Sequence, residues 1–490
     1  MRSESECVRT LDVDPSSRPV TLVGNDEIIA GLDDACIQQA INARLAPGVT
    51  NVVVNPDAHV GYGAPVGCVM TSPTHIYPGP VGVDIKCSMS LLQTNIPASE
   101  IDDRKIRKQL IKAICARIPT GTGRGQRSAP KARRIDTRLG FAAATRGASK
   151  QVLKKLGIPK AWAERCEDAA HTAADGSFET LEARLDAMLE NRKLERFAMQ
   201  ASQLGSLGGG NHFGECETVK LSPNAELRQT AQSFGLRDGC VAFLSHCGSR
   251  GFGHTLATRQ FSTLKSHFRK SGLAFPAGDQ DLVYAPLGSD AADCYLSDMA
   301  MGANFATVNH LLINQLVLEA FQQVIPGTQG QLVYFISHNI ARREMIEGRA
   351  EWVHRKGATR AFPAGHPELT KTPFADTGHP ILLPGNPRDG SSVMVALPGA
   401  ARSAFSVNHG AGRQMSRRKA KLQLDQDFID AEFAAADILS NCARYPKDEA
   451  PAAYKDFSQV LASVQGAGLA VEVARLNARF VIKDGAEPDD

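Results

Sequence analysis

A glycine-rich segment, Ser406-Val-Asn-His-Gly-Ala-Gly-Arg413, has residue types suited to phosphate chemistry. Near neutral pH an imidazole with an ordinary pKa is largely unprotonated, so His409 could attack a phosphorus atom and hold it as a phosphoramidate. Gly410 and Gly412 would let backbone amides approach an anion, and Arg413 could bind phosphate in a bidentate way. An isolated segment of this kind is more often an ordinary tight turn. The rest of the chain must therefore decide between the two interpretations.

Three histidines earlier in the chain also follow segments of a recurring kind. His212 comes after the glycine-rich residues 204–210, and His246 and His338 each come directly after an apolar, β-like run. Loops at the ends of strands carry much of the chemistry that rigid scaffolds support. One histidine in such a place is usually a hydrogen-bonded structural residue. Three in the same local setting predict a shared site.

An aspartate and a cysteine, Asp84 and Cys87, stand at the end of another apolar run. In extended structure residues three apart face opposite ways, so both can bind one ion only if the chain turns between them. Alone the pair is a weak metal signal. Together with His212, His246 and His338 it offers nitrogen, oxygen and sulfur ligands suited to zinc, manganese, cobalt or iron. A bridging thiolate could serve two ions, although spacing alone does not bring the five residues together.

Hydrophobic periodicity predicts the elements that would position these residues. Apolar β-like runs cover residues 52–54, 240–245, 332–337 and 471–481. Helical patterns cover residues 33–44, 101–118, 299–318 and 424–439, and a helical pair, broken near 175–177, is expected outside the core within 150–202. Residues 56–67 are predicted to be rich in turns, and residues 382–392 to form a loop between β runs.

The overall composition is that of a globular protein, with 490 residues, 43% of them hydrophobic, and a net charge of only +3. Binding of nucleic acid would therefore depend on local basic patches, such as residues 124–134, 355–360 and 413–421, although charge runs are commonly just solvated surface. The eleven cysteines lack zinc-ribbon spacing. No signal peptide or membrane span is recognisable, so we expect a cytoplasmic protein with reduced thiols.

Seven motifs, taken together, resemble the RtcB family of RNA-splicing ligases. They occur in the family's order over most of the chain: Asp57-Ala-His-Val-Gly-Tyr-Gly, Gly82-Val-Asp-Ile-Lys-Cys87, Gly210-Asn-His-Phe-Gly-Glu215, His246-Cys-Gly-Ser-Arg-Gly-Phe-Gly-His254, Ser337-His-Asn-Ile-Ala341, Arg355-Lys-Gly-Ala-Thr-Arg-Ala and His409-Gly-Ala-Gly-Arg413. We expect an α+β fold, one large domain spanning residues 1–490, with mixed β-sheets around a metal centre and helices outside. A helical insertion is expected at about 150–202, and the acidic C-terminal tail is expected to be frayed.

The resemblance implies an enzyme that joins an RNA 2′,3′-cyclic phosphate or 3′-phosphate end to a 5′-hydroxyl end, with GTP and two manganese ions as cofactors. By resemblance, Asp84, Cys87, His212, His246 and His338 are the metal ligands. His409 is then the catalytic nucleophile that takes GMP from GTP. The guanylate pocket implied by the motifs comprises Asn211, His212, Phe213, Gly214, Glu215, His338, Asn339, Pro384, Gly385, Ser391, His409, Gly410, Ala411, Gly412 and Lys483. Within it, Glu215 is a candidate for recognising the guanine edge.

Some positions depart from the family pattern. Residues 384–389 replace a typical Ser-Met-Gly-Thr run, which affects the contacts expected with the triphosphate. Asn408 stands where many members have cysteine, Lys86 where asparagine is usual, and Val83 where tyrosine is common. These differences indicate a divergent branch of the family, whose substrate or partner could differ from that of a housekeeping tRNA ligase.

Two other classes of function fit part of the pattern. A metal-dependent cyclic-phosphate phosphoesterase would need the metal ligands but not His409, and a non-catalytic RNA-end-binding protein would need only the basic patches. The complete set of histidines together with the glycine motif favours the ligase. Its expected partners are RNA and GTP, with an activating protein possible; we expect a monomer and no membrane association.

Overall fold

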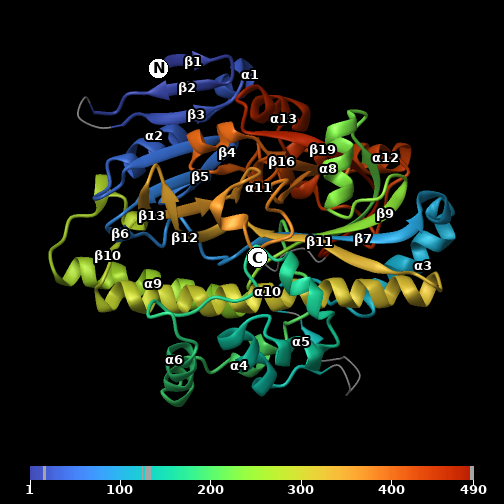
Figure 1. Ribbon diagram of the computed structural model, residues 1–490, viewed down its shortest axis with the longest axis horizontal. Coiled ribbons are helices and arrows are strands. Elements are labelled where there is room, and N and C mark those ends of the chain that lie inside the picture. Colours follow the sequence, from blue (N-terminus) through green and yellow to red (C-terminus); the bar gives the residue numbers. More distant parts are fainter. Residues whose placement is uncertain (15–17, 124, 127–133, 486–490) are drawn as a thin grey trace.

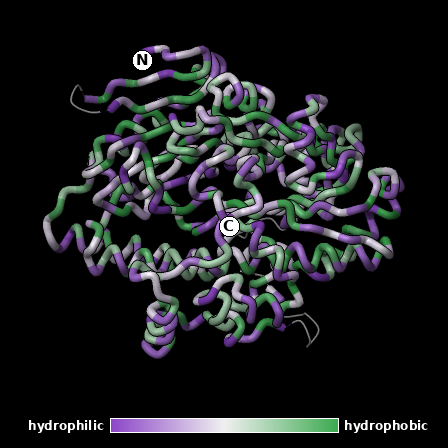
Figure 2. Tube along the Cα trace, viewed as in Figure 1, coloured by the Kyte–Doolittle hydropathy of each residue, from purple (hydrophilic) through white to green (hydrophobic). Residues whose placement is uncertain are grey.

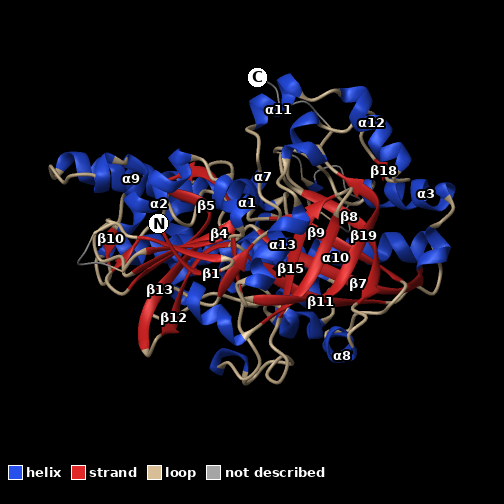
Figure 3. Cartoon of the chain, turned by 90° about the horizontal axis from the view of Figure 1, so that it is seen from above, coloured by secondary structure: helices blue, strands red, loops and turns tan. Residues whose placement is uncertain are grey.

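The computed structural model describes residues 1–14, 18–123, 125–126 and 134–485, and shows two large β-sheets resting on one long helix (Figure 1). The sequence-based expectation for the tail, residues 486–490, and most of the basic patch at 124–134 lie outside the described residues. The two sheets lie side by side when seen from above, with a helix between them (Figure 3). The protein thus has the mixed α and β structure with several sheets that the sequence predicts, and two of the sheets are large.

The first sheet has the strand order β1-β2-β3-β4-β5-β13-β12, and all its pairs are antiparallel except β3 with β4. Its strands are β1 Arg2–Ser5, β2 Val8–Leu11, β3 Val20–Val23, β4 Asn51–Tyr62, β5 Ala64–Ser72, β12 Asn339–Ile346 and β13 Arg349–Lys356. The edge strand β1 is exposed and hydrophilic, as Figure 2 shows. An edge of this kind discourages pairing with other chains.

The second sheet has the order β11-β7-β9-β8-β19-β16-β15, with β18 pairing in parallel with β19. Its strands are β7 Ser88–Pro97, β8 Phe213–Leu221, β9 Cys240–Cys247, β11 Gly330–Ser337, β15 Pro380–Asn386, β16 Gly390–Ala396, β18 Leu439–Ser440 and β19 Ala470–Ile482. Two short pairs complete the strands: β6 His75–Ile76 with β10 Ala285–Pro286, and β14 Ala358–Arg360 with β17 Ser406–Asn408.

The helices surround these sheets. They are α1 Asp26–Ala30, α2 Asp34–Arg44, α3 Arg104–Cys115, α4 Thr137–Arg146, α5 Lys150–Leu156, α6 Glu179–Glu190, α7 Phe197–Ala201, α8 Ala225–Ser233, α9 Arg250–Lys270, α10 Asp290–Val324, α11 Arg417–Gln423, α12 Gln426–Ala435 and α13 Phe457–Gly466. Helix α2 packs on the first sheet, and α13 contacts β4 of the first sheet and β19 of the second. None of the helices in the described ranges is both long enough and apolar enough to cross a membrane.

Helix α10 is the central support of the second sheet. Ser289 caps its start by accepting a hydrogen bond from the backbone N–H of Ala292, and Pro326 follows its end. Its side chains pack against β7, β9 and β11, and Phe305, Ile313 and Phe321 are fully buried there. Each such side chain contributes about 1.5–3 kcal/mol by leaving water. The helix therefore fixes the strands whose ends carry the candidate site.

The helices α4, α5 and α6 lie on the far side of α10 from the sheets (Figure 1). Helices were expected in residues 150–202, and α5, α6 and α7 lie there. That this group is an insertion into a single domain spanning residues 1–490 stays a prediction.

Two sequence-based expectations about loops are wrong. Residues 56–67, expected to be turns, belong mostly to the hairpin of β4 and β5, whose pairing shifts register between Val54 and Tyr62. Residues 382–392, expected to be a loop, form most of the hairpin of β15 and β16. Strand β15 is an edge strand, where a proline such as Pro384 costs no ladder hydrogen bond.

Candidate active site

The register of four strands brings the predicted metal ligands to one edge of the second sheet. Ser88 pairs with Cys247 and with Ser337, and Phe213 pairs with His246. Cys87 precedes β7, His212 precedes β8, and His338 follows β11, so all three lie beside His246 at the end of β9. His338 is also the one residue between β11 of the second sheet and β12 of the first. The site therefore lies where the two sheets meet.

The turn that sequence analysis required between Asp84 and Cys87 is present. The backbone N–H of Cys87 donates to the carbonyl of Asp84 at 3.1 Å, and Lys86 adopts a left-handed conformation with φ of 52°. Gly248 packs against the Asp84 carboxylate so closely that a Cβ there would lie 2.3 Å from its Oδ1. The turn directs the carboxylate and the thiol into the same site.

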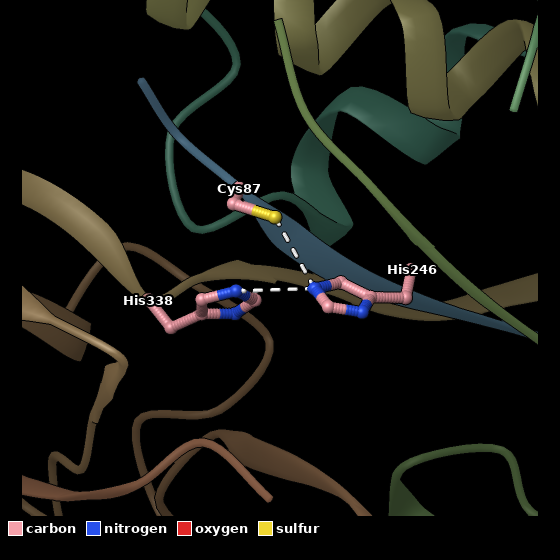
Figure 4. A group of neighbouring side chains, drawn as sticks. All are labelled: Cys87, His246 and His338. Atoms are coloured by element: carbon pink, nitrogen blue, oxygen red, sulfur yellow. Dashed lines mark hydrogen bonds between the residues drawn. The ribbon is translucent and has the colours of Figure 1, made fainter. Parts of the chain in front are cut away.

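Two groups of potential ligands share the thiol of Cys87. In the first group, drawn in Figure 4, Nε2 of His246 lies 3.2 Å from the Cys87 sulfur and 3.2 Å from Nε2 of His338. In the second, Nε2 of His212 lies 2.9 Å from Asp84 Oδ2 and 3.5 Å from the same sulfur. Within each group the ligand atoms are within 4.8 Å of one another. The five side chains could hold one or two cations, with the Cys87 thiol common to both groups.

The electrostatics of the site favour cation binding. Burial lowers the pKa of His246 and of His338 well below the usual range, so both rings are neutral. Nδ1 of His246 lies 3.0 Å from the carbonyl oxygen of Asn211; as the donor there, it leaves the Nε2 lone pair facing the sulfur. Burial would raise the pKa of Asp84, but the hydrogen bond and charge of His212 hold it at about 2. Burial raises the pKa of the Cys87 thiol to about 12, and a bound divalent cation would lower it. The charges of Cys247, Cys87 and Asp84 outweigh burial and raise the pKa of His212 well above its usual range, so a cation would bind there in place of a proton. With that proton displaced, the nitrogen, oxygen and sulfur atoms fit one or two transition-metal ions.

His409 lies next to these ligands and has an acidic partner. It follows β17, and its ring centroid is 4.8 Å from that of His338. Its Nδ1 lies 2.6 Å from Oδ2 of the fully buried Asp57, which also accepts the backbone N–H of His409 at 3.1 Å. Gly412, with φ of 73°, has its Cα beside the Asp57 backbone, where a Cβ would lie 2.1 Å from the carbonyl oxygen. This glycine lets the His409 loop close over β4.

The segment before His409 is held by a buried ion pair. Arg355 makes two hydrogen bonds of 2.7 Å to the carboxylate of Glu344, and its Nε donates to Ser406 Oγ at 2.8 Å. It also donates to the carbonyl oxygens of Ala404 and Phe405. Arg355 thereby fixes the start of the glycine-rich segment at three consecutive residues.

A cavity of about 590 Å³ extends from the ligand groups. It is lined by most of the residues predicted for the guanylate pocket: Asn211, Phe213, Glu215, His338, Asn339, Pro384, Gly385, Ser391, His409, Gly410, Ala411, Gly412 and Lys483. His212 and Gly214 are buried without lining the cavity. Residues from positions 59 to 483 thus meet around one space of a size suited to a nucleotide.

Glu215 and Lys483 lie at the start of β8 and just after β19, strands that pair in the sheet centre. Glu215 is 3% exposed, and burial raises its pKa to about 8 against the opposing charge of Lys483. Lys483 is held by Glu449, whose Oε2 accepts its hydrogen bond at 2.8 Å. A carboxyl acceptor and an ammonium donor therefore face the same cavity.

The divergent loop at residues 386–389 makes hydrogen bonds within itself. Asn386 accepts the backbone N–H groups of Arg388 and Asp389, each at 3.0 Å, and donates to the Asp389 carboxylate at 2.7 Å. Arg388 pairs with Asp389 and with Glu432 of α12. Of the divergent residues 384–389, the cavity is lined by Pro384, Gly385, Asn386 and Pro387, so any phosphate contact from this run would come from these four.

Sequence reasoning missed several residues that the structure places in the site. Asp57 was noted as an acid in a motif, but nothing in the sequence paired it with a histidine 352 positions away. Lys356 was noted only as part of the basic patch 355–360, and it lines the cavity with its Nζ 3.5 Å from the Tyr62 ring centroid, where burial lowers its pKa to about 7. Glu449 and Tyr454 also line it, and no pattern in their segment indicated a site.

Known proteins are similar to this sequence over most of its length. A family model described as tRNA-splicing ligase RtcB matches residues 39–484. The tRNA-splicing ligase RtcB of Thermococcus kodakarensis is 35% identical over 95% of this chain and 94% of its own length. That of Aeropyrum pernix is 32% identical over 96% of both chains. The RNA-splicing ligase RtcB of Mycobacterium tuberculosis is 34% identical over 89% of this chain and 98% of its own.

Proposed function

The chain belongs to the RtcB family and is an RNA ligase; from this we propose that it joins RNA 2′,3′-cyclic phosphate or 3′-phosphate ends to 5′-hydroxyl ends, using GTP and a guanylylated His409. The single observation that carries the proposal is the pairing of His409 with the buried Asp57 beside a cavity of nucleotide size. A phosphoesterase would need neither of these two residues.

We propose that Asp57 sets the tautomer of His409. Its carboxylate accepts the Nδ1 proton, so Nε2 keeps its lone pair for the α-phosphorus of GTP. As the N–P bond forms and pyrophosphate leaves, the ring gains positive charge, which the carboxylate at 2.6 Å stabilises. A polar partner without charge would stabilise it less.

The GMP group is then transferred from His409 to the RNA 3′-phosphate. An RNA 3′-phosphate is a poor electrophile because attack by the 5′-hydroxyl would have to expel hydroxide. Once it is joined to GMP, attack forms the new phosphodiester and releases GMP, while His409 returns to its free state. Arg413 and Arg417 line the cavity as cations that would orient these phosphates.

The proposed metal ions, two of manganese, would be held by Asp84, Cys87, His212, His246 and His338. Bound there, they would supply Lewis-acid neutralisation of phosphate charge and a nucleophile for opening a cyclic end. All eleven cysteines are unpaired, which fits the reducing cytoplasm that we propose as the compartment, with the protein acting as a monomer.

The test is incubation with α-labelled GTP and manganese, without RNA, for the wild type and His409→Ala. An acid-labile, alkali-stable protein adduct in the wild type alone is expected for a histidine phosphoramidate. Absence of an adduct with every divalent ion tried would overturn the nucleophile assignment. The phosphoesterase would then be tested with an RNA that ends in a cyclic phosphate.

A further inference from the structure

Glu449 is a buried carboxylate on which four cavity side chains converge. It ends the short turn Lys447–Glu449 and is 3% exposed. Its Oε2 accepts hydrogen bonds from Lys483 Nζ at 2.8 Å and Tyr454 Oη at 2.7 Å. Its Oε1 lies 2.5 Å from Arg417 and 3.3 Å from Arg413. The donors come from three places in the chain, residues 413–417, Tyr454 and Lys483, and all meet at this one side chain.

The neighbouring Asp448 has a narrower role. Its carboxylate pairs with Arg417 at 2.7 Å, and its backbone carbonyl accepts from Arg413 at 2.7 Å. Among the contacts of the described residues, its side chain reaches neither Lys483 nor Tyr454. Both carboxylates therefore pair with Arg417, but of the two only Glu449 contacts Lys483 and Tyr454, and an experiment can use the difference at the lysine.

The ion pairs that Glu449 makes with Lys483, Arg413 and Arg417 require its carboxyl group to be ionised. Burial acts to raise its pKa, but the charges of Lys483 and Arg417 outweigh burial and hold the pKa below the usual range. The three cations Arg413, Arg417 and Lys483 are then balanced by two carboxylates. One positive charge is left over, which suits a cavity that receives a phosphorylated ligand.

We propose that Glu449 is a positioning residue for nucleobase choice, which holds Lys483 so that the cavity accepts a 6-oxopurine and rejects a 6-aminopurine. This inference rests on the proposed function, because it assumes that a purine nucleotide enters the cavity. Lys483 lies beside Glu215 and 5.8 Å from the Phe213 ring, at a part of the cavity with an apolar wall.

The chemistry of the two side chains explains the choice. An ammonium group is a donor only, so it pairs with the carbonyl oxygen of guanine and not with the amino group of adenine. In its ionised form, which the charge of Lys483 favours, the Glu215 carboxylate accepts from the N–H groups on the same edge of guanine, whereas adenine offers an acceptor there. Sites built from buried hydrogen-bonding groups discriminate strongly because the wrong ligand leaves those groups unpaired. Without the Glu449 charge, Lys483 can turn away and the discrimination falls.

The experiment compares Glu449→Gln with Asp448→Asn, each an isosteric removal of one charge from adjacent residues. Binding of GMP and of AMP is measured by calorimetry, and adduct formation is measured with α-labelled GTP and ATP. For E449Q we expect the ratio of GMP to AMP affinity to fall by about tenfold or more, the factor that corresponds to ~1.4 kcal/mol. For D448N we expect the ratio to stay within about twofold of the wild-type ratio, because Lys483 keeps its partner.

An unchanged ratio in E449Q, or an equal fall in D448N, overturns the inference. If E449Q does not fold, Glu449→Asp takes its place. This variant keeps the charge but moves it away from Lys483 by one methylene, so we expect a smaller fall in the ratio of GMP to AMP affinity. An unchanged ratio would again count against the inference. A wild type that binds no GMP and forms no adduct overturns the proposed function and this inference with it. GMP binding by the wild type with an unaltered ratio in the variant overturns this inference alone.

Discussion

Replacing Asp57 by Asn separates the charge of the His409 partner from its shape. The wild-type carboxylate is fully buried and lies 2.6 Å from Nδ1. Hydrogen bonds to charged groups contribute about 1.5–3 kcal/mol, which corresponds to a factor of about 10 to 150 in rate. An asparagine can also donate its N–H to Nδ1, which would place the ring proton on Nε2 and remove the attacking lone pair; in the serine-protease triad the equivalent change costs about 10⁴ in rate. We therefore expect adduct formation to slow by about 10²- to 10⁴-fold in D57N.

The assay is single-turnover guanylylation with α-labelled GTP over a range of GTP concentrations. Since Asp57 is not among the residues that line the cavity, the GTP concentration at half-maximal rate should change by less than about threefold, with the loss in the maximal rate. His409→Ala provides the background without a nucleophile. A maximal rate for D57N within about threefold of wild type would refute the reasoning, because it would show that neither the charge nor the tautomer matters.

Three further outcomes are expected. Cys87→Ser should reduce manganese binding at both ligand groups, whereas His212→Ala should reduce it at one; equilibrium dialysis that gives the same stoichiometry for both variants would contradict the shared thiolate. Arg355→Met should destabilise the fold by about 3–5 kcal/mol because it leaves the Glu344 carboxylate buried and unpaired, and adding Glu344→Gln should recover part of that loss in thermal unfolding. Burial lowers the pKa of Lys356 from 10.5 to about 7. Between pH 7 and pH 10.5 the lysine is therefore protonated in the unfolded chain and neutral in the folded chain. The free energy of unfolding should therefore rise with pH across this window, by at most ~1.4 kcal/mol per unit, and urea titrations of Lys356→Met should lack this contribution.

The sequence singled out the proposed metal ligands and the proposed nucleophile because each stands at a recognisable break in a pattern, and the structure brings these residues together. His246 and His338 follow apolar runs that are strands, and a strand that ends at a sheet edge fixes where its last side chain lies. Local pattern and resemblance agreed at these residues. The structure adds the register that joins them, which no single segment contains.

The partners of these residues could not be predicted in the same way. Asp57 lies in β4 within the register shift between Val54 and His59, so its direction does not follow from strand alternation. Glu449 acts through Lys483, 34 positions later, and through Arg417, 32 positions earlier, and nothing local marks such distant ion pairs. The β15 strand was missed because Pro384 and Gly385 usually interrupt strands, and its place at the sheet edge becomes evident only from the complete sheet.

The position of β19 has a consequence for how the protein is made. This strand, residues 470–482, lies between β8 and β16 in the interior of the second sheet, although it is the last strand in the described chain. During synthesis β7, β8 and β9 can pair early, but β15 and β16 have no place in the sheet until β19 has left the ribosome. Until then the side chains of β16 and the loop that leads to His409 stay unpacked, exposed to solvent and to other chains. Folding of this enzyme therefore finishes late, and the interval before β19 emerges is when a chaperone would be most useful to it.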